Sequence, residues 1–170
     1  MTTAVSRATT LAMSAATRRA RGKALLLPQQ VVTSPETKLQ YRIESLLGQG
    51  GFGQAYLARR VTRSRAVPMV VALKASEHID GWLREAYFGR ILEGNTRAIR
   101  VFDAFPMTRD DGSALYCLAL EWAKHGDLRT FLQKSGKGWA ERTVRREIAG
   151  ILRSSGVSIG ARCCTAISRR

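Results

Sequence analysis

A cluster of glycines between two apolar stretches is the first feature of this sequence that could do chemistry. Gly48, Gly50 and Gly53 have the spacing Gly-x-Gly-x-x-Gly, and Gly51 adds a fourth glycine. Because glycine has no Cβ atom, the backbone of such a segment can approach a phosphate group and direct its amide N–H groups at the oxygens. Glycine-rich hairpins share this spacing, so the motif alone is weak evidence for a phosphate site.

The flanks of the cluster distinguish between two kinds of phosphate-binding turn. A dinucleotide-binding motif follows a strand and opens a helix. Here both flanks have the pattern of strands, with residues 41–47 before the glycines and Ala55-Tyr56-Leu57 after them. The pattern therefore predicts a strand–turn–strand hairpin and argues against the dinucleotide fold.

Two residues of opposite charge follow the hairpin, one at the end of an expected strand and one within an expected helix. Lys74 ends the apolar run Val71-Ala72-Leu73, and Glu85 lies 11 residues later in the middle of a helical pattern. An ammonium group on the strand beside the glycine turn can reach phosphate oxygens, and a carboxylate on the helix can hold it by an ion pair. The alternative is a solvated lysine and a glutamate that pairs within its own helix. The position of Lys74 on the next strand favours the first interpretation.

The elements that must position these residues follow from hydrophobic periodicity. Leu83, Tyr87 and Ile91 recur at helical spacing between Gly81 and Gly94. The expected elements, in chain order, are strands near 41–47, 55–57, 67–75, 98–105 and 114–122, with the helix at 81–94 before the last two strands, and then helices at 127–134 and 139–152. This order predicts an α+β fold in which a five-stranded antiparallel sheet packs on one helix and a short link leads to further helices.

The combined motifs resemble the protein kinase family in order and spacing. Besides the glycine turn, the Val-Ala-Leu-Lys strand and the helix with a central Glu, the chain has Leu118-Ala119-Leu120-Glu121-Trp122-Ala123 followed by Gly126-Asp127-Leu128. The resemblance covers roughly residues 41–152. It implies a kinase-like small lobe with its hinge at 36–123 and the start of the large lobe, two helices, at 124–152. It also implies a serine/threonine kinase that uses ATP and Mg²⁺ to phosphorylate a protein.

The same resemblance implies roles for individual residues. The turn residues Gly48, Gly50, Gly51, Phe52 and Gly53 would cradle the phosphates, Lys74 would grip them and Glu85 would hold Lys74. Leu47, Ala55 and Ala72 would line the adenine slot, Leu120 would be the gatekeeper, and backbone groups of Glu121 and Ala123 would hydrogen-bond adenine. Asp127 would reach the ribose or, alternatively, cap the following helix.

Other parts of the kinase machinery do not occur in these 170 residues. A kinase needs a catalytic-loop Asp, an Asn and the Asp of Asp-Phe-Gly, which binds magnesium. The two histidines, His78 and His125, are expected to be surface residues rather than bases. We therefore expect this chain alone to be nearly inactive in phosphoryl transfer.

The net charge of +15 is concentrated at the two ends. Residues 1–35 hold five basic residues and no acid, and residues 151–170 hold four and no acid. We expect 1–35 to be a basic, disordered leader, with a targeting segment or a start codon assigned too early as alternatives. A solvated tail is favoured over a nucleic-acid or membrane contact, because no aromatic residues accompany the charge.

Residues 153–170 abruptly lose apolar periodicity and are interpreted as an out-of-frame tail. Read one base out of frame, the segment can encode His-Arg-Asp followed four residues later by Asn, which is the kinase catalytic-loop pattern. The hypothesis is a one-base slip near Leu152, and the coding DNA decides it.

The remaining expectations concern partners and location. No apolar run is long enough to span a membrane, and the three cysteines have no metal-ligand spacing, so a cytoplasmic protein is expected. That it binds ATP is implied by the kinase resemblance. The parent protein would also bind a protein substrate. Two alternatives from other classes are a non-catalytic nucleotide-binding or interaction module and a nucleic-acid binder that acts through its basic tail.

Overall fold

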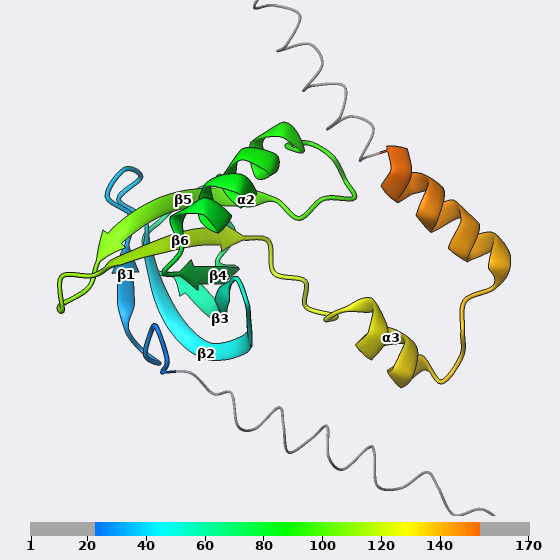
Figure 1. Ribbon diagram of the computed structural model, residues 1–170, viewed down its shortest axis with the longest axis horizontal. Coiled ribbons are helices and arrows are strands. Elements are labelled where there is room, and N and C mark those ends of the chain that lie inside the picture. Colours follow the sequence, from blue (N-terminus) through cyan, green and yellow to red (C-terminus); the bar gives the residue numbers. More distant parts are fainter. Residues whose placement is uncertain (1–22, 154–170) are drawn as a thin grey trace, which may run out of the picture.

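The fold is a curled antiparallel sheet with helices outside it. The computed structural model describes residues 23–153. Six strands form one sheet in the order β1-β2-β3-β4-β6-β5. Their bounds are Val31–Thr33 (β1), Gln40–Gly50 (β2), Gly53–Arg60 (β3), Val70–Ser76 (β4), Val101–Thr108 (β5) and Ala114–Leu120 (β6). The helices in the described part are α2 (Ile79–Ile91), α3 (Leu128–Ser135) and residues 141–153 (Figure 1). The predicted α+β class is confirmed.

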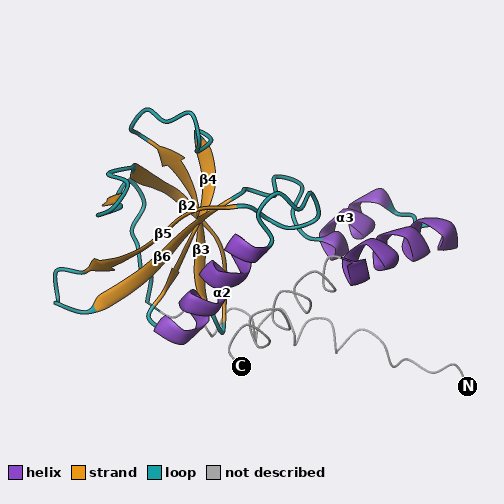
Figure 2. Cartoon of the chain, turned by 90° about the horizontal axis from the view of Figure 1, so that it is seen from above, coloured by secondary structure: helices purple, strands orange, loops and turns teal. Residues whose placement is uncertain are grey.

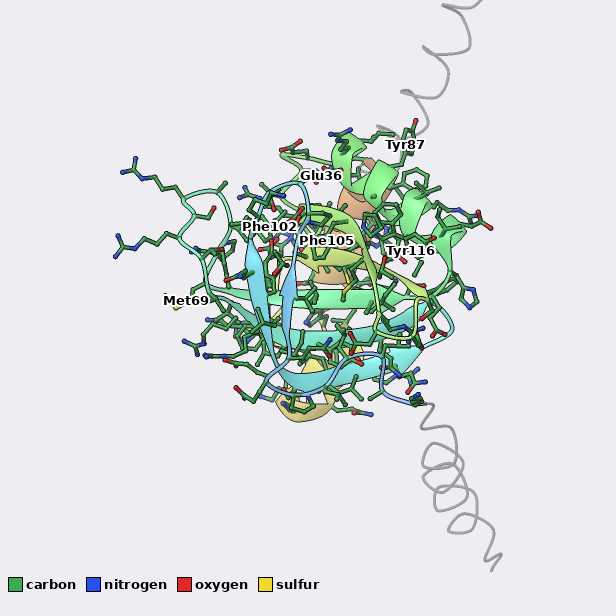
Figure 3. All side chains as sticks on the ribbon, turned by 90° about the vertical axis from the view of Figure 1, so that its left-hand side faces the viewer. Glu36, Met69, Tyr87, Phe102, Phe105 and Tyr116 are labelled. Carbon is green, nitrogen blue, oxygen red and sulfur yellow. The ribbon has the colours of Figure 1, made fainter. Side chains whose placement is uncertain are left out.

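The core lies inside the curl of the sheet. Alternate residues of the central strands are buried, for example Tyr56 and Ala58 on β3 and Leu73 on β4, because successive side chains of a strand point to opposite faces. Tyr41 from β2 and Phe105 from β5 stack across the interior with ring centroids 6.1 Å apart. Figure 2 shows the strands wrapped around this interior, and Figure 3 shows Phe105 within it.

The helices occupy two separate places. Helix α2 packs on the outer face of the sheet against β4, β5 and β6, whereas α3 and helix 141–153 follow β6 and stand away from the sheet (Figure 1). An ion pair between Arg97 Nη1 and Glu147 Oε2, 2.5 Å apart, joins the last helix to the loop after α2. The segment that follows β6 connects the sheet to these two helices.

The predicted five-stranded sheet is wrong by one strand, and the predicted leader extends too far. β1 lies within the segment assigned to the leader, and Leu26 and Val32 are fully buried in the core. The amide N–H groups of Leu25 and Leu26 donate to the hydroxyl of Tyr56. A strand of three residues is too short to show a pattern of alternating apolar and polar residues in the sequence. Residues 1–22 and 154–170 lie outside the described residues, and with them the rest of the leader, the frame hypothesis and the tail.

The other predicted elements are present with small shifts. All five expected strands occur, and β2 continues into the glycine cluster as far as Gly50. Helix α2 begins at Ile79, two residues before the expected Gly81. Helix α3 starts directly after Asp127, and Gly136 at its C-cap has a φ of 63°, which is a common way for a helix to end.

Candidate functional site

The register of the sheet places several candidate residues on one face. Ala55 on β3 is directly opposite Lys74 on β4, and Ala72 is directly opposite Leu120 on β6. On the other side of Ala55, its partner is Gly48 on β2. Residues that face each other on neighbouring strands point to the same side of a sheet. Ala55, Ala72, Lys74 and Leu120 therefore share the outer face, opposite the buried core.

Lys74 and Glu85 meet on this outer face. Lys74 Nζ donates a hydrogen bond to Glu85 Oε1, which makes an ion pair between β4 and the middle of α2. The Lys74 side chain is 21% exposed and the Glu85 side chain is 37% exposed. Because water still reaches both groups, the pair can reorganise around an incoming anion.

The glycine turn is a tight hairpin at the end of β2 and β3. Gly50 pairs with Gly53, so Gly51 and Phe52 form the two-residue turn. Gly53 has a φ of +115°, and a Cβ atom there would lie 2.2 Å from the carbonyl oxygen of Ala75. Only glycine fits this position. At Gly48, Gly50 and Gly51 the space for a Cβ is open, so the backbone of the turn is accessible to a ligand.

The Phe52 ring covers Lys74 from the turn. Lys74 Nζ lies 5.7 Å from the centroid of the ring, although Phe52 as a whole is 71% exposed. The cavity between Phe52, Lys74, Trp82 and Glu85 has a volume of only about 10 Å³. The space between Phe52 and the Lys74–Glu85 pair is therefore almost filled in this structure, and a phosphate group could reach Lys74 from this side only if Phe52 moved.

The segment after β6 leaves several backbone groups without a hydrogen bond in the described part of the chain, including one acceptor and one donor near Leu120. The Glu121 amide N–H donates to the carbonyl oxygen of Arg100 over 2.9 Å, and the Ala123 carbonyl accepts from Gly126 over 3.0 Å. Within residues 23–153, the Glu121 carbonyl and the Ala123 amide N–H take part in no hydrogen bond. One acceptor and one donor are thus available next to Leu120.

Two other candidate residues have more ordinary surroundings. Asp127 caps α3, because its side chain accepts a 2.7 Å hydrogen bond from the Thr130 amide N–H. This hydrogen bond lowers the pKa of Asp127 below its usual value. Leu47 lies at an irregularity in the β2–β3 register, between Leu46 and Gly48, and is 48% exposed. Of its two alternative roles, Asp127 has the helix cap in this structure.

Trp82 is a residue of this site that the sequence reasoning missed. Its Nε1 donates a 2.9 Å hydrogen bond to the carbonyl oxygen of Cys117 on β6, and its ring lies 5.4 Å from that of Tyr116. The spacing of three residues between Trp82 and Glu85 was the available signal, since it places both on one helix face. The Cys117 thiol is buried, which raises its pKa to about 12 and keeps it protonated.

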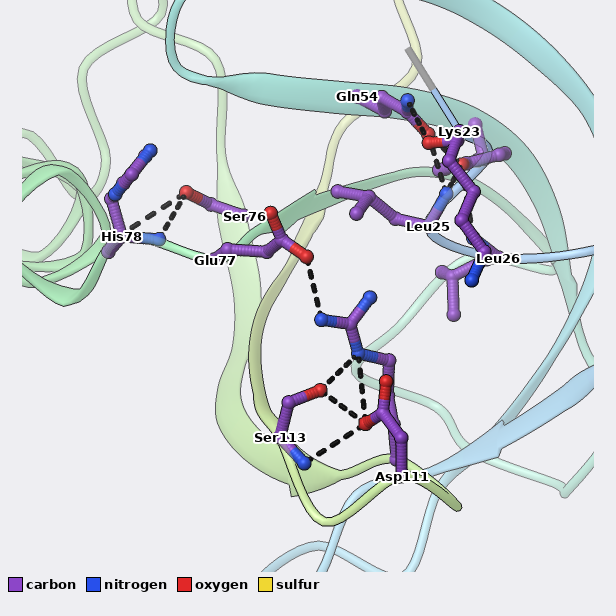
Figure 4. A network of polar contacts seen from close by, with 11 residues as sticks. Lys23, Leu25, Leu26, Gln54, Ser76, Glu77, His78, Asp111 and Ser113 are labelled. Atoms are coloured by element: carbon purple, nitrogen blue, oxygen red, sulfur yellow. Dashed lines mark hydrogen bonds and ion pairs between the residues drawn. The ribbon is translucent and has the colours of Figure 1, made fainter.

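A second polar region lies where the chain enters the curled sheet (Figure 4). It surrounds a cavity of about 300 Å³ that Lys23, Gln54 and Arg109 help to line. Arg109 donates to Glu77 over 2.5 Å and to Ser113 over 2.7 Å. Hydrogen bonds from Ser113 lower the pKa of the neighbouring Asp111. Glu77 and Asp111 offset the charge of Arg109, whereas Lys23 adds a further positive charge to the lining of the cavity.

Comparisons with known proteins add no relative. No family model matches the chain, and no curated protein matches it.

Between Lys23 and Arg153, no three His, Cys, Asp or Glu side chains gather in a way that could hold a metal ion. In the same part of the chain, no helix is both long and apolar enough to cross a bilayer. The functional proposal therefore rests on the residues and their geometry.

Proposed function

We propose that this chain is the ATP-binding part of a serine/threonine protein kinase. The observation that supports it best is the Lys74–Glu85 ion pair, which lies between β4 and α2 and beneath a glycine turn. A kinase small lobe needs this arrangement, since a lysine held by a helix carboxylate positions the phosphates of ATP. The antiparallel sheet with one packed helix is consistent with it, although the sheet has six strands where five were expected.

In this proposal the phosphates bind between the glycine turn and Lys74. The space around the Cβ positions of Gly50 and Gly51 is open, so backbone N–H groups of the turn can donate to the phosphate oxygens once Phe52 has moved aside. Lys74 neutralises part of the phosphate charge, and Glu85 keeps its ammonium group in place. The missing Cβ atoms leave the room that this close approach requires.

The adenine ring binds on the small side chains beside Lys74. Ala55 and Ala72 leave a shallow apolar surface on the outer face, and Leu120 limits its depth. The Glu121 carbonyl accepts from the adenine amino group, and the Ala123 amide N–H donates to a ring nitrogen. Both backbone groups are among those that make no hydrogen bond within residues 23–153.

The kinase motifs that bind magnesium do not occur in this sequence. The 170 residues contain no Asp-Phe-Gly and no His-Arg-Asp motif, and the acid nearest the phosphates, Glu85, is paired with Lys74. The chain is therefore proposed to bind ATP with the metal that ATP carries, and to transfer no phosphoryl group by itself. Transfer to a protein Ser or Thr, in the cytoplasm, is the proposed activity of the complete kinase.

Calorimetric titration with Mg-ATP tests the proposal. We expect the full chain to bind Mg-ATP and Lys74→Met to lose at least ~10-fold in affinity, since one charge-assisted hydrogen bond contributes about 1.5–3 kcal/mol. The exposed Lys137 provides the control, and Lys137→Met should bind like the wild type. Absence of binding, or equal binding by Lys74→Met, would contradict the proposal.

A kinase assay separates the proposal from a non-catalytic module. Restoring the shifted reading frame beyond Leu152 should add the catalytic loop and, with the remaining large lobe, phosphoryl transfer to Ser/Thr peptides. A coding sequence without His-Arg-Asp in that frame would favour a nucleotide-binding module without catalysis. Transfer by the present 170-residue chain would contradict its proposed inactivity.

A further inference from the structure

Helix α2 is held to the sheet by few contacts. None of its residues is fully buried, and Leu83 and Tyr87 are each 51% exposed. Its N-cap residue, His78, makes no capping hydrogen bond through its side chain. A helix with so little buried surface gains little stability from packing. The rotation of α2 about its own axis, and with it the direction of Glu85, must therefore depend on a few specific contacts.

Those contacts lie on a single helix face that includes Glu85. Trp82, Glu85 and Gly89 follow one another at i, i+3 and i+7, which places them on one face. Trp82 contacts β6 through the Cys117 carbonyl, and Glu85 contacts β4 through Lys74. At Gly89 the helix touches β5, because a Cβ atom there would lie 2.2 Å from Cγ2 of Val101. Glu85 is thus flanked by one contact on each side.

The Trp82 contact is directional, whereas the Gly89 contact is only steric. An indole has a single N–H donor, and at 2.9 Å from a main-chain oxygen it fixes both the height and the rotation of the helix. The ring also lies against Tyr116, the residue before Cys117. Rotation of α2 that breaks this hydrogen bond would also turn Glu85 away from Lys74.

We infer that Trp82 is a positioning residue that sets the direction of Glu85 and so holds Lys74 ready for phosphate. Trp82 itself does not touch the nucleotide. The expected change in nucleotide affinity rests on the proposed function. The geometric part, control of the Lys74–Glu85 pair by Trp82, can be measured without any nucleotide.

The geometric part is tested by NMR of the full chain with isotope-labelled lysine side chains. Glu85→Gln defines the Lys74 resonance without the ion pair. Trp82→Phe keeps a smaller aromatic ring at this position and removes the N–H donor, and it should move the Lys74 resonance toward the Glu85→Gln position. Trp139→Phe, which removes an indole far from α2, is the control and should leave the resonance unchanged. An unchanged Lys74 resonance in folded Trp82→Phe overturns the inference.

The consequence for binding is tested by a double-mutant cycle with Mg-ATP. Trp82→Phe should weaken affinity about three- to tenfold, in line with the loss of one hydrogen bond, and should cause no further loss in the Glu85→Gln background. Additive losses would overturn the inference, because they would mean that Trp82 does not act through Glu85. If the wild type binds no Mg-ATP while the Lys74 resonance responds as expected, the proposed function fails and the positioning role stands.

Gly89 supplies a second variant if Trp82→Phe does not fold. Gly89→Ala should push α2 away from Val101 and disturb the Lys74 resonance in the same direction. The double variant Gly89→Ala/Val101→Ala removes the methyl groups of Val101 but keeps its Cβ atom, which lies 2.9 Å from the position of the new one, and it should restore the wild-type resonance in part. A folded Gly89→Ala variant with an unchanged Lys74 resonance also counts against the inference.

Discussion

Lys74 on β4 and Glu85 on α2 form the ion pair that joins the sheet to its helix. The pair lies at the sheet surface rather than inside the core, and both side chains remain in contact with water. The pair is only partly buried, and ion pairs that water reaches contribute little to stability, typically less than about 1 kcal/mol. Its presence therefore points to a role in positioning charge rather than in holding the fold together.

Glu85→Gln should separate binding from stability. We expect Mg-ATP affinity to fall about tenfold, because the neutral amide no longer fixes the ammonium group of Lys74. The melting temperature should change by no more than ~4 °C, the shift that corresponds to about 1 kcal/mol in a domain of this size. Calorimetric titration and thermal unfolding monitored by circular dichroism measure the two effects. A large loss of stability with unchanged affinity would assign the pair a structural role.

Gly53→Ala should destabilise the hairpin strongly. The new methyl group would lie 2.2 Å from the Ala75 carbonyl oxygen, and the φ of +115° is unfavourable for alanine. Strain of this kind costs on the order of 1–3 kcal/mol. Urea unfolding measures the cost, and Gly51→Ala is the matched control because its Cβ would meet open space. Equal stability of the two variants would mean that the close approach at Gly53 is relieved by movement of the turn.

Phe52→Ala should increase the affinity for Mg-ATP. In the structure the Phe52 ring covers Lys74 and leaves almost no free volume between the ring and the Lys74–Glu85 pair. Removing this cation–π contact, which is worth about 0.5–1 kcal/mol when partly exposed, should raise affinity about two- to fivefold. Phe131→Ala on α3 is the control, because Phe131 is also partly exposed. A lower affinity would instead show that Phe52 closes over the bound phosphates.

The candidate site was predictable where its residues follow local patterns. The glycine turn, Lys74 at the end of a strand and Glu85 in mid-helix each carry a spacing that sequence alone reveals. The pairing of Lys74 with Leu118 and of Ala72 with Leu120 also follows once β4 and β6 are neighbours. The strand order therefore had to be known before these separate motifs could be placed on one face of the sheet.

The parts that sequence could not predict depend on contacts between distant segments. Trp82 differs little from any aromatic residue on an amphipathic helix until the Cys117 carbonyl is found opposite its indole. Likewise, nothing in the pattern indicates that the Phe52 ring would fold over Lys74. The segment of Leu26 and Val32 was assigned to a disordered leader because its composition is basic, although its apolar side chains close the core.

Leu26→Ala tests whether the segment before β1 belongs to the core. Leu26 is 1% exposed, and its removal leaves a cavity among the residues of the curled sheet. Substitutions of this kind cost about 2–5 kcal/mol. The neighbouring Leu27 is 63% exposed, so Leu27→Ala should change the free energy of unfolding little. Urea unfolding of both variants measures the difference, and equal stabilities would place the segment outside the core.

Asp127 should make the start of α3 sensitive to acid. The hydrogen bond from the Thr130 amide holds the pKa of Asp127 below its ordinary 3.8. A group with a lowered folded-state pKa stabilises the fold above its ordinary pKa and loses this contribution as pH falls through the lowered value. The Thr130 amide shift, followed by NMR, should therefore be constant above about pH 4 and change only at lower pH. In Asp127→Asn the neutral amide still caps the helix, so the transition should disappear. A Thr130 transition at or above pH 3.8 in the wild type would show that this cap is not formed in solution.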